Sequence, residues 1–129
     1  MSDTAKRNAL NRVYLKNHIL RVDVIGDQTQ ETVEDMGRQL TDHIVQLRKA
    51  GQKVLLLDNV QKIGRTDMQA VRAVAILGRI LDYDRAAMVG DGSAPMRTGI
   101  NLLLRTIRRS SIQYFSNLKD AETWLREFN

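Results

Sequence analysis

Polar side chains suited to binding follow two short apolar runs of the sequence. The runs 54–57 (Val-Leu-Leu-Leu) and 85–89 (Arg-Ala-Ala-Met-Val) each predict a short, buried, parallel strand. In open α/β sheets, function usually lies where the carboxyl ends of such strands meet the helices that follow. The candidate residues for binding a protein partner or a small ligand are Asp58, Asn59, Gly64, Arg65, Thr66, Asp91 and Ser93.

Two loops of the predicted sheet could bind an anion. Gly64 and Arg65 combine a flexible backbone with a guanidinium group, beside the free N–H groups of a predicted helix start. The simpler alternative is an exposed loop whose arginine is solvated. The loop 90–93 also contains two glycines, but it lacks the lysine and the spacing of a Walker loop, and Asp91 would repel phosphate.

Thr66 has two possible roles at the start of the predicted helix 66–81. Gln69 follows it by three residues, which is the spacing of a capping box. As a phosphosite, Thr66 would gain a charge of about −1.5 to −2 where the helix dipole favours negative charge. A cap requires no modification. We therefore favour capping and keep phosphorylation as the second interpretation.

The residue types that catalysis and metal binding need are scarce. The chain has no cysteine and only two histidines, His18 in a predicted hairpin turn and His43 on a predicted helix. These positions do not predict a shared metal site, and no base–nucleophile set is evident. We expect a protein that is not an enzyme and that uses no metal and no cofactor.

Length and polarity predict one domain in a reducing compartment. A chain of 129 residues is long enough for a core without disulfides. Residues 1–11 are polar and predict a flexible arm, followed by a single domain over 12–129. No secretory signal is apparent, and no segment approaches the roughly 20 apolar residues of a transmembrane helix. The expected location is the cytoplasm.

The net charge of +5 permits binding to nucleic acid, anionic membranes or acidic proteins. However, the three tyrosines, two phenylalanines and one tryptophan are not interleaved with basic runs, as stacking platforms for nucleic acid are. A row of arginines, Arg97, Arg105, Arg108 and Arg109, predicts a solvated helix face. Nucleic-acid binding is therefore not expected.

Hydrophobic periodicity predicts a β-β-α-β-α-β-α-β-α order. A hairpin at Asn17-His18 joins the first two strands, and a turn at 26–29 precedes a helix that Asp27 or Thr29 could cap. Such alternation predicts an α/β fold, with a mixed, mostly parallel sheet packed with helices. The predicted strands are 13–16, 19–24, 54–57, 85–89 and 112–115.

Three segments of this pattern resemble the STAS domain (sulphate transporter and anti-sigma-factor antagonist), and more closely its SpoIIAA-like family. They are Val-Leu-Leu-Leu-Asp at 54–58, Asp-Arg-Ala-Ala-Met-Val-Gly-Asp at 84–91, and the segment Ile112–Leu125 with its Asp-Ala-x-x-Trp-Leu ending. The resemblance covers nearly the whole chain from Val13. These segments are packing patterns rather than chemical fingerprints.

The resemblance implies a non-enzymatic regulator that binds a protein partner, such as an anti-sigma factor or a kinase-like regulator. In the antagonists, a serine is phosphorylated within Asp-Ser-Ser-Gly-Leu. That segment falls on residues 64–68 here, with Arg65 at the phosphorylated serine and Thr66 at the second serine. This departure makes the phosphorylation switch doubtful, and only a shifted register would bring Thr66 to the modified position.

Two further expectations accompany the resemblance. The SpoIIAA-like group resembles the CRAL-TRIO lipid-binding domains in fold, so the alternative function is binding of a small apolar molecule or lipid. Four methionines could line its pocket, although core filling is the commoner role of methionine: Met36, Met68, Met88 and Met96. A homodimer is also possible, through the edge strand of the hairpin or the last helix.

Overall fold

The computed structural model describes residues 10–128, and most of the predicted arm 1–11 lies outside that range. The last two residues of the predicted arm, Leu10 and Asn11, are bound to the second strand. The Leu10 N–H donates to the Ile25 carbonyl, and the Ile25 N–H donates to Asn11 Oδ1 at 3.1 Å. The elements are β1 (Arg12–Lys16), β2 (Ile19–Gln28), α2 (Gln30–Lys49), β3 (Leu55–Thr66), α3 (Met68–Ile80), β4 (Arg85–Val89), α4 (Ala94–Ile107), β5 (Ile112–Phe115) and α5 (Leu118–Arg126).

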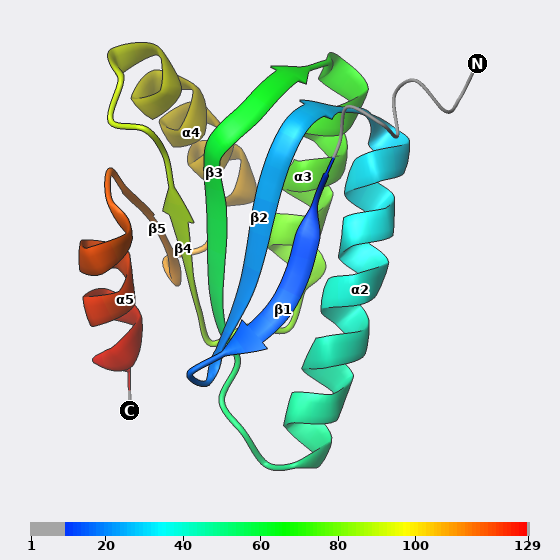
Figure 1. Ribbon diagram of the computed structural model, residues 1–129, viewed down its shortest axis with the longest axis vertical. Coiled ribbons are helices and arrows are strands. Elements are labelled where there is room, and N and C mark those ends of the chain that lie inside the picture. Colours follow the sequence, from blue (N-terminus) through cyan, green and yellow to red (C-terminus); the bar gives the residue numbers. More distant parts are fainter. Residues whose placement is uncertain (1–9, 129) are drawn as a thin grey trace.

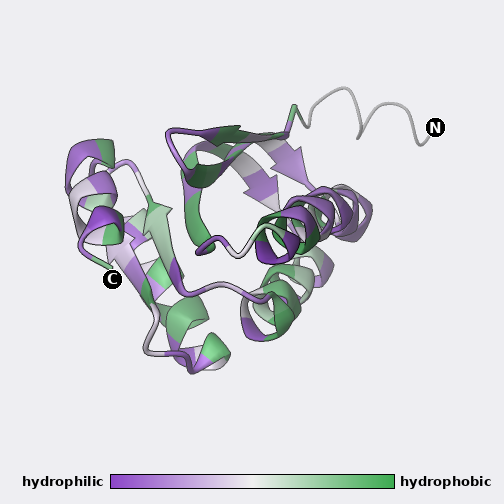
Figure 2. Ribbon diagram, turned by 90° about the horizontal axis from the view of Figure 1, so that it is seen from below, coloured by the Kyte–Doolittle hydropathy of each residue, from purple (hydrophilic) through white to green (hydrophobic). Residues whose placement is uncertain are grey.

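The five strands form one sheet in the order β1-β2-β3-β4-β5, in which β1 is antiparallel to β2 and the other pairs are parallel. Helices cover both faces unequally (Figures 1 and 2). The larger core packs α2, α3 and α4 against one face, and the smaller core packs Ala121 and Leu125 of α5 against the other. The predicted α/β class and element order are confirmed.

Local signals placed most element boundaries correctly. Asn17 and His18 form the hairpin turn, with φ values of 53° and 66°. Thr29, one of the two predicted candidates, caps α2 by accepting from the Thr32 N–H at 3.3 Å. The Asn117 side chain caps α5 by accepting from the Asp120 N–H at 2.9 Å, as its spacing predicted.

The structure corrects the predictions that the third strand ends at Leu57 and that 26–29 is a turn. β3 runs for 12 residues and stays paired with β2 to its end, where Gln28 lies opposite Thr66. The pairing with β4 stops earlier, at Asn59 opposite Val89. The last third of β2 and the second half of β3, here called the β2–β3 extension, therefore curve away from the rest of the sheet (Figure 1).

The predicted capping box at Thr66 is wrong by one residue. Thr66 is the last residue of β3, and Asp67 is the N-cap of α3, where its carboxylate accepts from the Ala70 N–H at 2.8 Å. Pairing with Gln28 keeps Thr66 in the strand, so the cap passes to the next residue. Thr66 is therefore not the helix cap that its spacing to Gln69 predicted.

Candidate functional site

The predicted site residues do not form one exposed surface. Asp58 and Asn59 lie within β3, where successive side chains point to opposite faces. Thr66 follows at the end of the strand, which curves, so that Thr66 and Asp58 line the same cavity. Asp91 and Ser93 lie beyond β4, from which β3 has by then separated. Of the predicted set, Asp58 and Thr66 therefore line one cavity, whereas Asp91 and Ser93 lie in the loop before α4.

Asn59, Gly64 and Arg65 have structural roles in the extension. Asn59 Oδ1 accepts from the Gln61 N–H at 3.0 Å, and the Arg65 N–H donates to Asp27 Oδ1 at 2.8 Å. A Cβ at Gly64 would collide with the Asp27 carboxylate, which explains the glycine there. The backbone N–H at Arg65 is thus already bound to a carboxylate, which weakens the predicted anion site.

Asp91 and Ser93 build the start of α4. Asp91 Oδ1 accepts from the Ser93 N–H at 2.8 Å, and Ser93 Oγ caps the helix by accepting from the Met96 N–H at 3.3 Å. Hydrogen bonds from Ser93 hold the pKa of Asp91 below its ordinary value. Pro95 lies in the first turn, as predicted.

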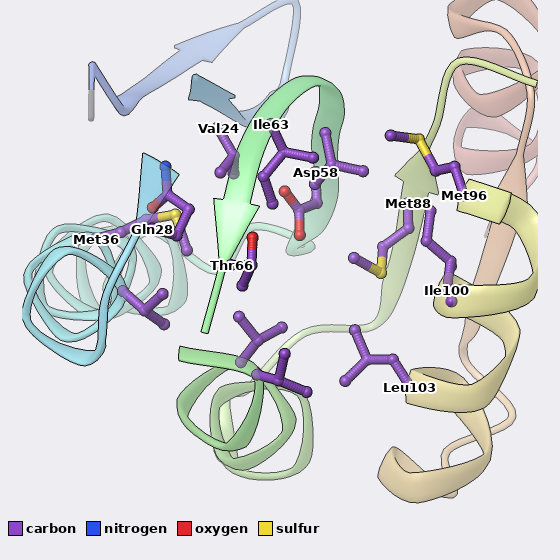
Figure 3. A pocket seen from close by; sticks show the side chains of 15 residues that line it. Val24, Gln28, Met36, Asp58, Ile63, Thr66, Met88, Met96, Ile100 and Leu103 are labelled. Atoms are coloured by element: carbon purple, nitrogen blue, oxygen red, sulfur yellow. The ribbon is translucent and has the colours of Figure 1, made fainter. Parts of the chain in front are cut away.

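A cavity of about 290 Å³ lies where the β2–β3 extension separates from β4 (Figure 3). The strands contribute Val24, Val60, Ile63 and Met88 to its wall. Three helices complete the wall through apolar side chains, chiefly Val33, Met36, Val74, Met96, Ile100 and Leu103. Because the extension separates from β4, a space remains between these strand residues and the helices.

Asp58 is the titratable residue of this wall, and its carboxylate faces the cavity (Figure 3). Its Oδ1 is buried and has no hydrogen-bond partner among the described residues. Burial, with a smaller contribution from the charge of Asp23, raises the pKa of Asp58 to about 7 from its ordinary 3.8. The side chain can therefore exist in both protonation states near neutral pH.

The two other polar side chains of the wall are satisfied. Gln28 is 3% exposed; its amide donates to Asn11 Oδ1 at 3.0 Å and accepts from the Thr32 hydroxyl at 3.0 Å. The Thr66 hydroxyl donates to the Gly64 carbonyl at 3.3 Å. Asp58 is thus the unsatisfied polar group of an otherwise apolar cavity.

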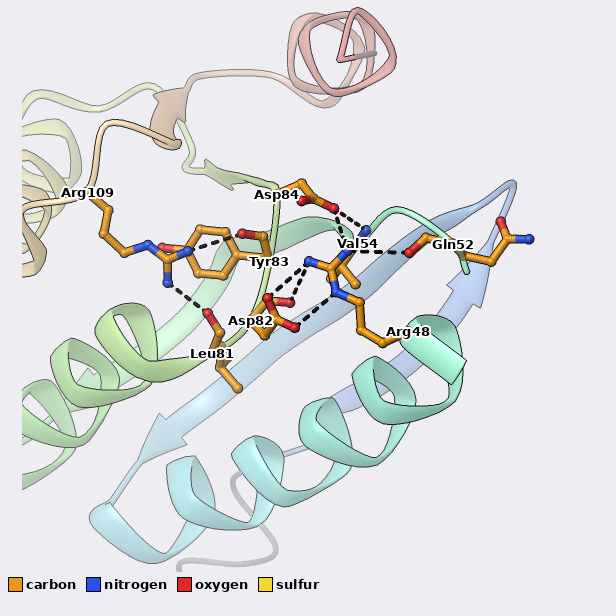
Figure 4. A network of polar contacts seen from close by, with 8 residues as sticks. All are labelled: Arg48, Gln52, Val54, Leu81, Asp82, Tyr83, Asp84 and Arg109. Carbon is orange, nitrogen blue, oxygen red and sulfur yellow. Dashed lines mark hydrogen bonds and ion pairs between the residues drawn. The ribbon is translucent and has the colours of Figure 1, made fainter. Parts of the chain in front are cut away.

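The opposite, amino ends of the strands carry a polar network without such an unsatisfied group (Figure 4). Arg48 binds Asp82 through two nitrogens at 3.0 and 3.1 Å and Asp84 at 2.9 Å. Asp84 also accepts from the Val54 N–H at 2.8 Å. These contacts join the end of α2 to the starts of β3 and β4.

Arg109 ties the end of α3 to the start of β5 in the same region (Figure 4). Its guanidinium donates to the carbonyls of Leu81 at 2.7 Å and Tyr83 at 3.1 Å, and it stacks on the Tyr83 ring at 3.6 Å. Arg109 is therefore half-buried, and the prediction that it belongs to a solvated row is wrong.

Sequence reasoning found Asp58 but missed most of the cavity wall. Three of the four methionines assigned to an apolar pocket do line it, whereas Met68 is 67% exposed. Val60 and Ile63 were placed in a loop because polar residues surround them. The apolar side chains of Val60 and Ile63 within this polar segment are the sequence feature that could have predicted a longer strand.

Within residues 10–128, no group of three or more acidic or histidine side chains could hold a metal ion, and no helix is long and apolar enough to cross a membrane. His18 lies in the hairpin turn and His43 on α2, as predicted.

Comparisons with known proteins identify the fold and the family. A crystal structure of an uncharacterized protein of the DUF3478 family from Shewanella loihica PV-4, described as having a SpoIIAA-like fold, matches with a TM-score of 0.62. The two chains are 17% identical, and the match covers 92% of this chain and 93% of that one. The comparison with curated proteins found no match. A model of the SpoIIAA-like family matches residues 19–126, which are most of the chain and include every residue that lines the cavity. The chain therefore belongs to the SpoIIAA-like family.

Proposed function

We propose that this SpoIIAA-like domain is a non-enzymatic binding module that holds a small apolar molecule in the cavity beside Asp58. The observation that carries the proposal is the apolar cavity of about 290 Å³ between the β2–β3 extension and α2, α3 and α4. Ligand sites are typically concave and apolar, with few polar groups that fix orientation. At about 30 Å³ for each non-hydrogen atom, as for a water molecule, the cavity suits roughly ten such atoms.

The position of the cavity gives a route for entry. Val71 of α3 is 40% exposed and Gly99 of α4 is exposed, yet both line the cavity. A molecule can therefore enter between α3 and α4. No reaction is part of the proposal, because the cavity wall offers Asp58 no second titratable group, and the Thr66 hydroxyl donates to the Gly64 carbonyl.

Binding of a protein partner, the function implied by the STAS resemblance, is the second candidate. The feature that favours it is the outer face of α3, where Met68, Ile76 and Ile80 are 67%, 52% and 69% exposed. Exposed apolar residues grouped on one helix favour a contact with another protein. The anti-sigma-factor type of partner, a homodimer, a cytoplasmic location and the absence of nucleic-acid binding stay predictions.

Phosphorylation of Thr66 also stays a prediction, and the local geometry gives it little support. The residue is half-buried, lies in a paired strand and contributes to the cavity wall. A Thr66→Ala protein is expected to fold normally because Asp67 supplies the cap.

The test uses octan-1-ol, which has nine non-hydrogen atoms, titrated into ¹⁵N-labelled protein and followed by NMR. We expect saturable shifts concentrated on the amides of Val60, Met88 and Ile100. Gly99→Leu should weaken binding at least tenfold, because Gly99 lines the cavity and an added Cβ there meets no atom within 4 Å.

The matched control is Asn101→Leu, which adds the same side chain to an exposed position of α4 outside the cavity wall. It should leave the affinity unchanged. Shifts that do not saturate, or equal weakening by both variants, would contradict the proposed function. As a second measurement, organic extracts of the protein purified from its native cells should contain a stoichiometric apolar compound.

A further inference from the structure

The cavity holds one group that its apolar character does not explain. A buried polar atom without a partner is costly, and such atoms are rare in folded proteins. Asp58 Oδ1 is one of them, and the carboxylate lies at the cavity (Figure 3). The Tyr114 hydroxyl is likewise buried and unpartnered, but Tyr114 does not line this cavity.

We propose that Asp58 binds the polar end of the ligand, and that the cavity selects apolar molecules carrying one hydrogen-bond donor, such as an aliphatic alcohol or amine. This inference rests on the proposed function. A carboxyl group can accept a hydrogen bond in either protonation state. A hydroxyl or ammonium group at the end of an apolar chain can therefore donate to the Asp58 carboxyl group while the chain fills the remaining space.

Among the side chains that line the cavity, Asp58 is the one whose polar group is available to bind the polar end of the ligand. Gln28 and Thr66 are occupied by hydrogen bonds within the protein. The neighbouring charge is that of Asp23 on β2, which accepts from the Tyr14 hydroxyl at 3.1 Å and disfavours the ionised form of Asp58. The residues that α2, α3, α4 and β4 contribute to the wall are not titratable. Nothing cationic in the wall competes with a donor from the ligand.

The first experiment compares octan-1-ol with its isomer 1-methoxyheptane, which has the same atoms but no hydrogen-bond donor. Affinities are measured by NMR titration at pH 7.5. The wild-type protein should bind the alcohol about tenfold more tightly. Asp58→Leu, which has the same number of side-chain atoms but no acceptor, should bring the ratio close to one. Asp58→Asn retains an acceptor oxygen and should keep the preference.

The second experiment uses octylamine, which stays cationic between pH 6 and pH 8. Because the pKa of Asp58 is about 7, its ionised fraction rises roughly tenfold between these values. Octylamine should therefore bind about tenfold more tightly to the wild-type protein at pH 8 than at pH 6. Asp58→Asn cannot ionise and should show no such change.

The outcomes separate this inference from the proposed function. Equal affinity for the alcohol and the ether in the wild-type protein, with shifts at the cavity, would overturn the role of Asp58 and leave apolar binding intact. An unchanged preference in Asp58→Leu would do the same. If neither molecule gives saturable shifts at the cavity, both proposals fail. Weakening of both molecules by Gly99→Leu, with discrimination lost only in Asp58→Leu, supports both.

Discussion

The Arg48 and Arg109 network at the amino ends of the parallel strands and the cavity at their carboxyl ends differ in how their polar groups are satisfied. At the amino ends, Arg48 joins two aspartates and Arg109 collects backbone carbonyls, so helix ends and strand starts are tied together. At the carboxyl ends, β3 departs from β4, and the Asp58 carboxylate faces an apolar cavity without a partner. An unsatisfied buried polar group costs about 1–3 kcal/mol. The network at the amino ends therefore stabilises the fold, while the cavity at the carboxyl ends retains an unsatisfied polar group.

The sharpest test of this comparison is Asp58→Asn, because it removes the ionisable group of the cavity. A carboxyl whose pKa rises from 3.8 to about 7 on folding loses stability as pH rises through that window. At about 1.4 kcal/mol per unit, the loss is at most about 4 kcal/mol at pH 8.

Asp58→Asn should therefore be more stable than the wild-type protein at pH 8, by up to about 4 kcal/mol, and nearly equal to it at pH 4. Urea unfolding at both pH values measures this. Asp42→Asn, at an exposed position of α2, is the matched control and should show no pH-dependent gain. A gain that is equal at pH 4 and pH 8 would refute the buried ionisation.

Arg48→Ala should cause the largest loss at the amino ends, about 2 kcal/mol, because it leaves Asp84 half-buried without its guanidinium. Burial raises the pKa of Asp84, but hydrogen bonds from Arg48 and Val54 outweigh this and hold it below 3.8. The contribution of this pair is therefore present above that pH and is lost as pH falls further.

The control for Arg48 is Arg38→Ala, since Arg38 forms an exposed ion pair with Asp35 at 3.3 Å. Such pairs contribute about 0–1 kcal/mol. Urea unfolding at pH 7 should separate the two variants by more than 1 kcal/mol. Equal losses would mean that the network stabilises no more than a surface ion pair.

Arg109→Lys should lower stability by about 1–2 kcal/mol, because an ammonium group cannot reach several carbonyls and stack on the Tyr83 ring together. Arg105→Lys, at an exposed position of α4, should change stability by less than about 0.5 kcal/mol. Thermal unfolding compares the two variants. If Arg109→Lys does not lower stability, a positive charge at this position is sufficient and the planar guanidinium group is not required.

Two glycine substitutions test the carboxyl ends with the smallest expected effects. Gly64→Ala should destabilise by about 1 kcal/mol or more, because its Cβ meets the Asp27 carboxylate that holds the β2–β3 extension. Gly99→Ala adds a Cβ in open space on α4 and should stabilise by about 0.5–1 kcal/mol. Unfolding midpoints that shift in the same direction for both would contradict the close approach at Gly64.

The sequence predicted those elements whose signals are local. The hairpin at Asn17-His18 and the cap at Asn117 depend on residues within a few positions of each other, and both are confirmed. The Ser93 side chain and Pro95 likewise begin α4 within the residues that surround them. Such signals need no knowledge of what packs on the element.

The second half of β3 was missed because its pattern is polar and irregular. Lys62, Gly64 and Arg65 favour a loop when considered alone, but pairing with β2 holds them in a strand through two register shifts. The same pairing moves the cap from Thr66 to Asp67. Backbone pairing with β2, whose residue Gln28 lies 38 positions before its partner Thr66, outweighs the local preference for a loop.

By itself, the sequence determined the α/β order, the family pattern and the presence of Asp58 directly after a buried apolar run. Tertiary structure alone decided that β3 continues beyond Asp58, that β4 does not follow it, and that three helices close over the space between. The physical reason is that a cavity forms where elements distant in the sequence do not pack together, and a local sequence pattern does not encode that arrangement. Residues such as Val60 and Met88 are ordinary apolar side chains until the strands that carry them separate.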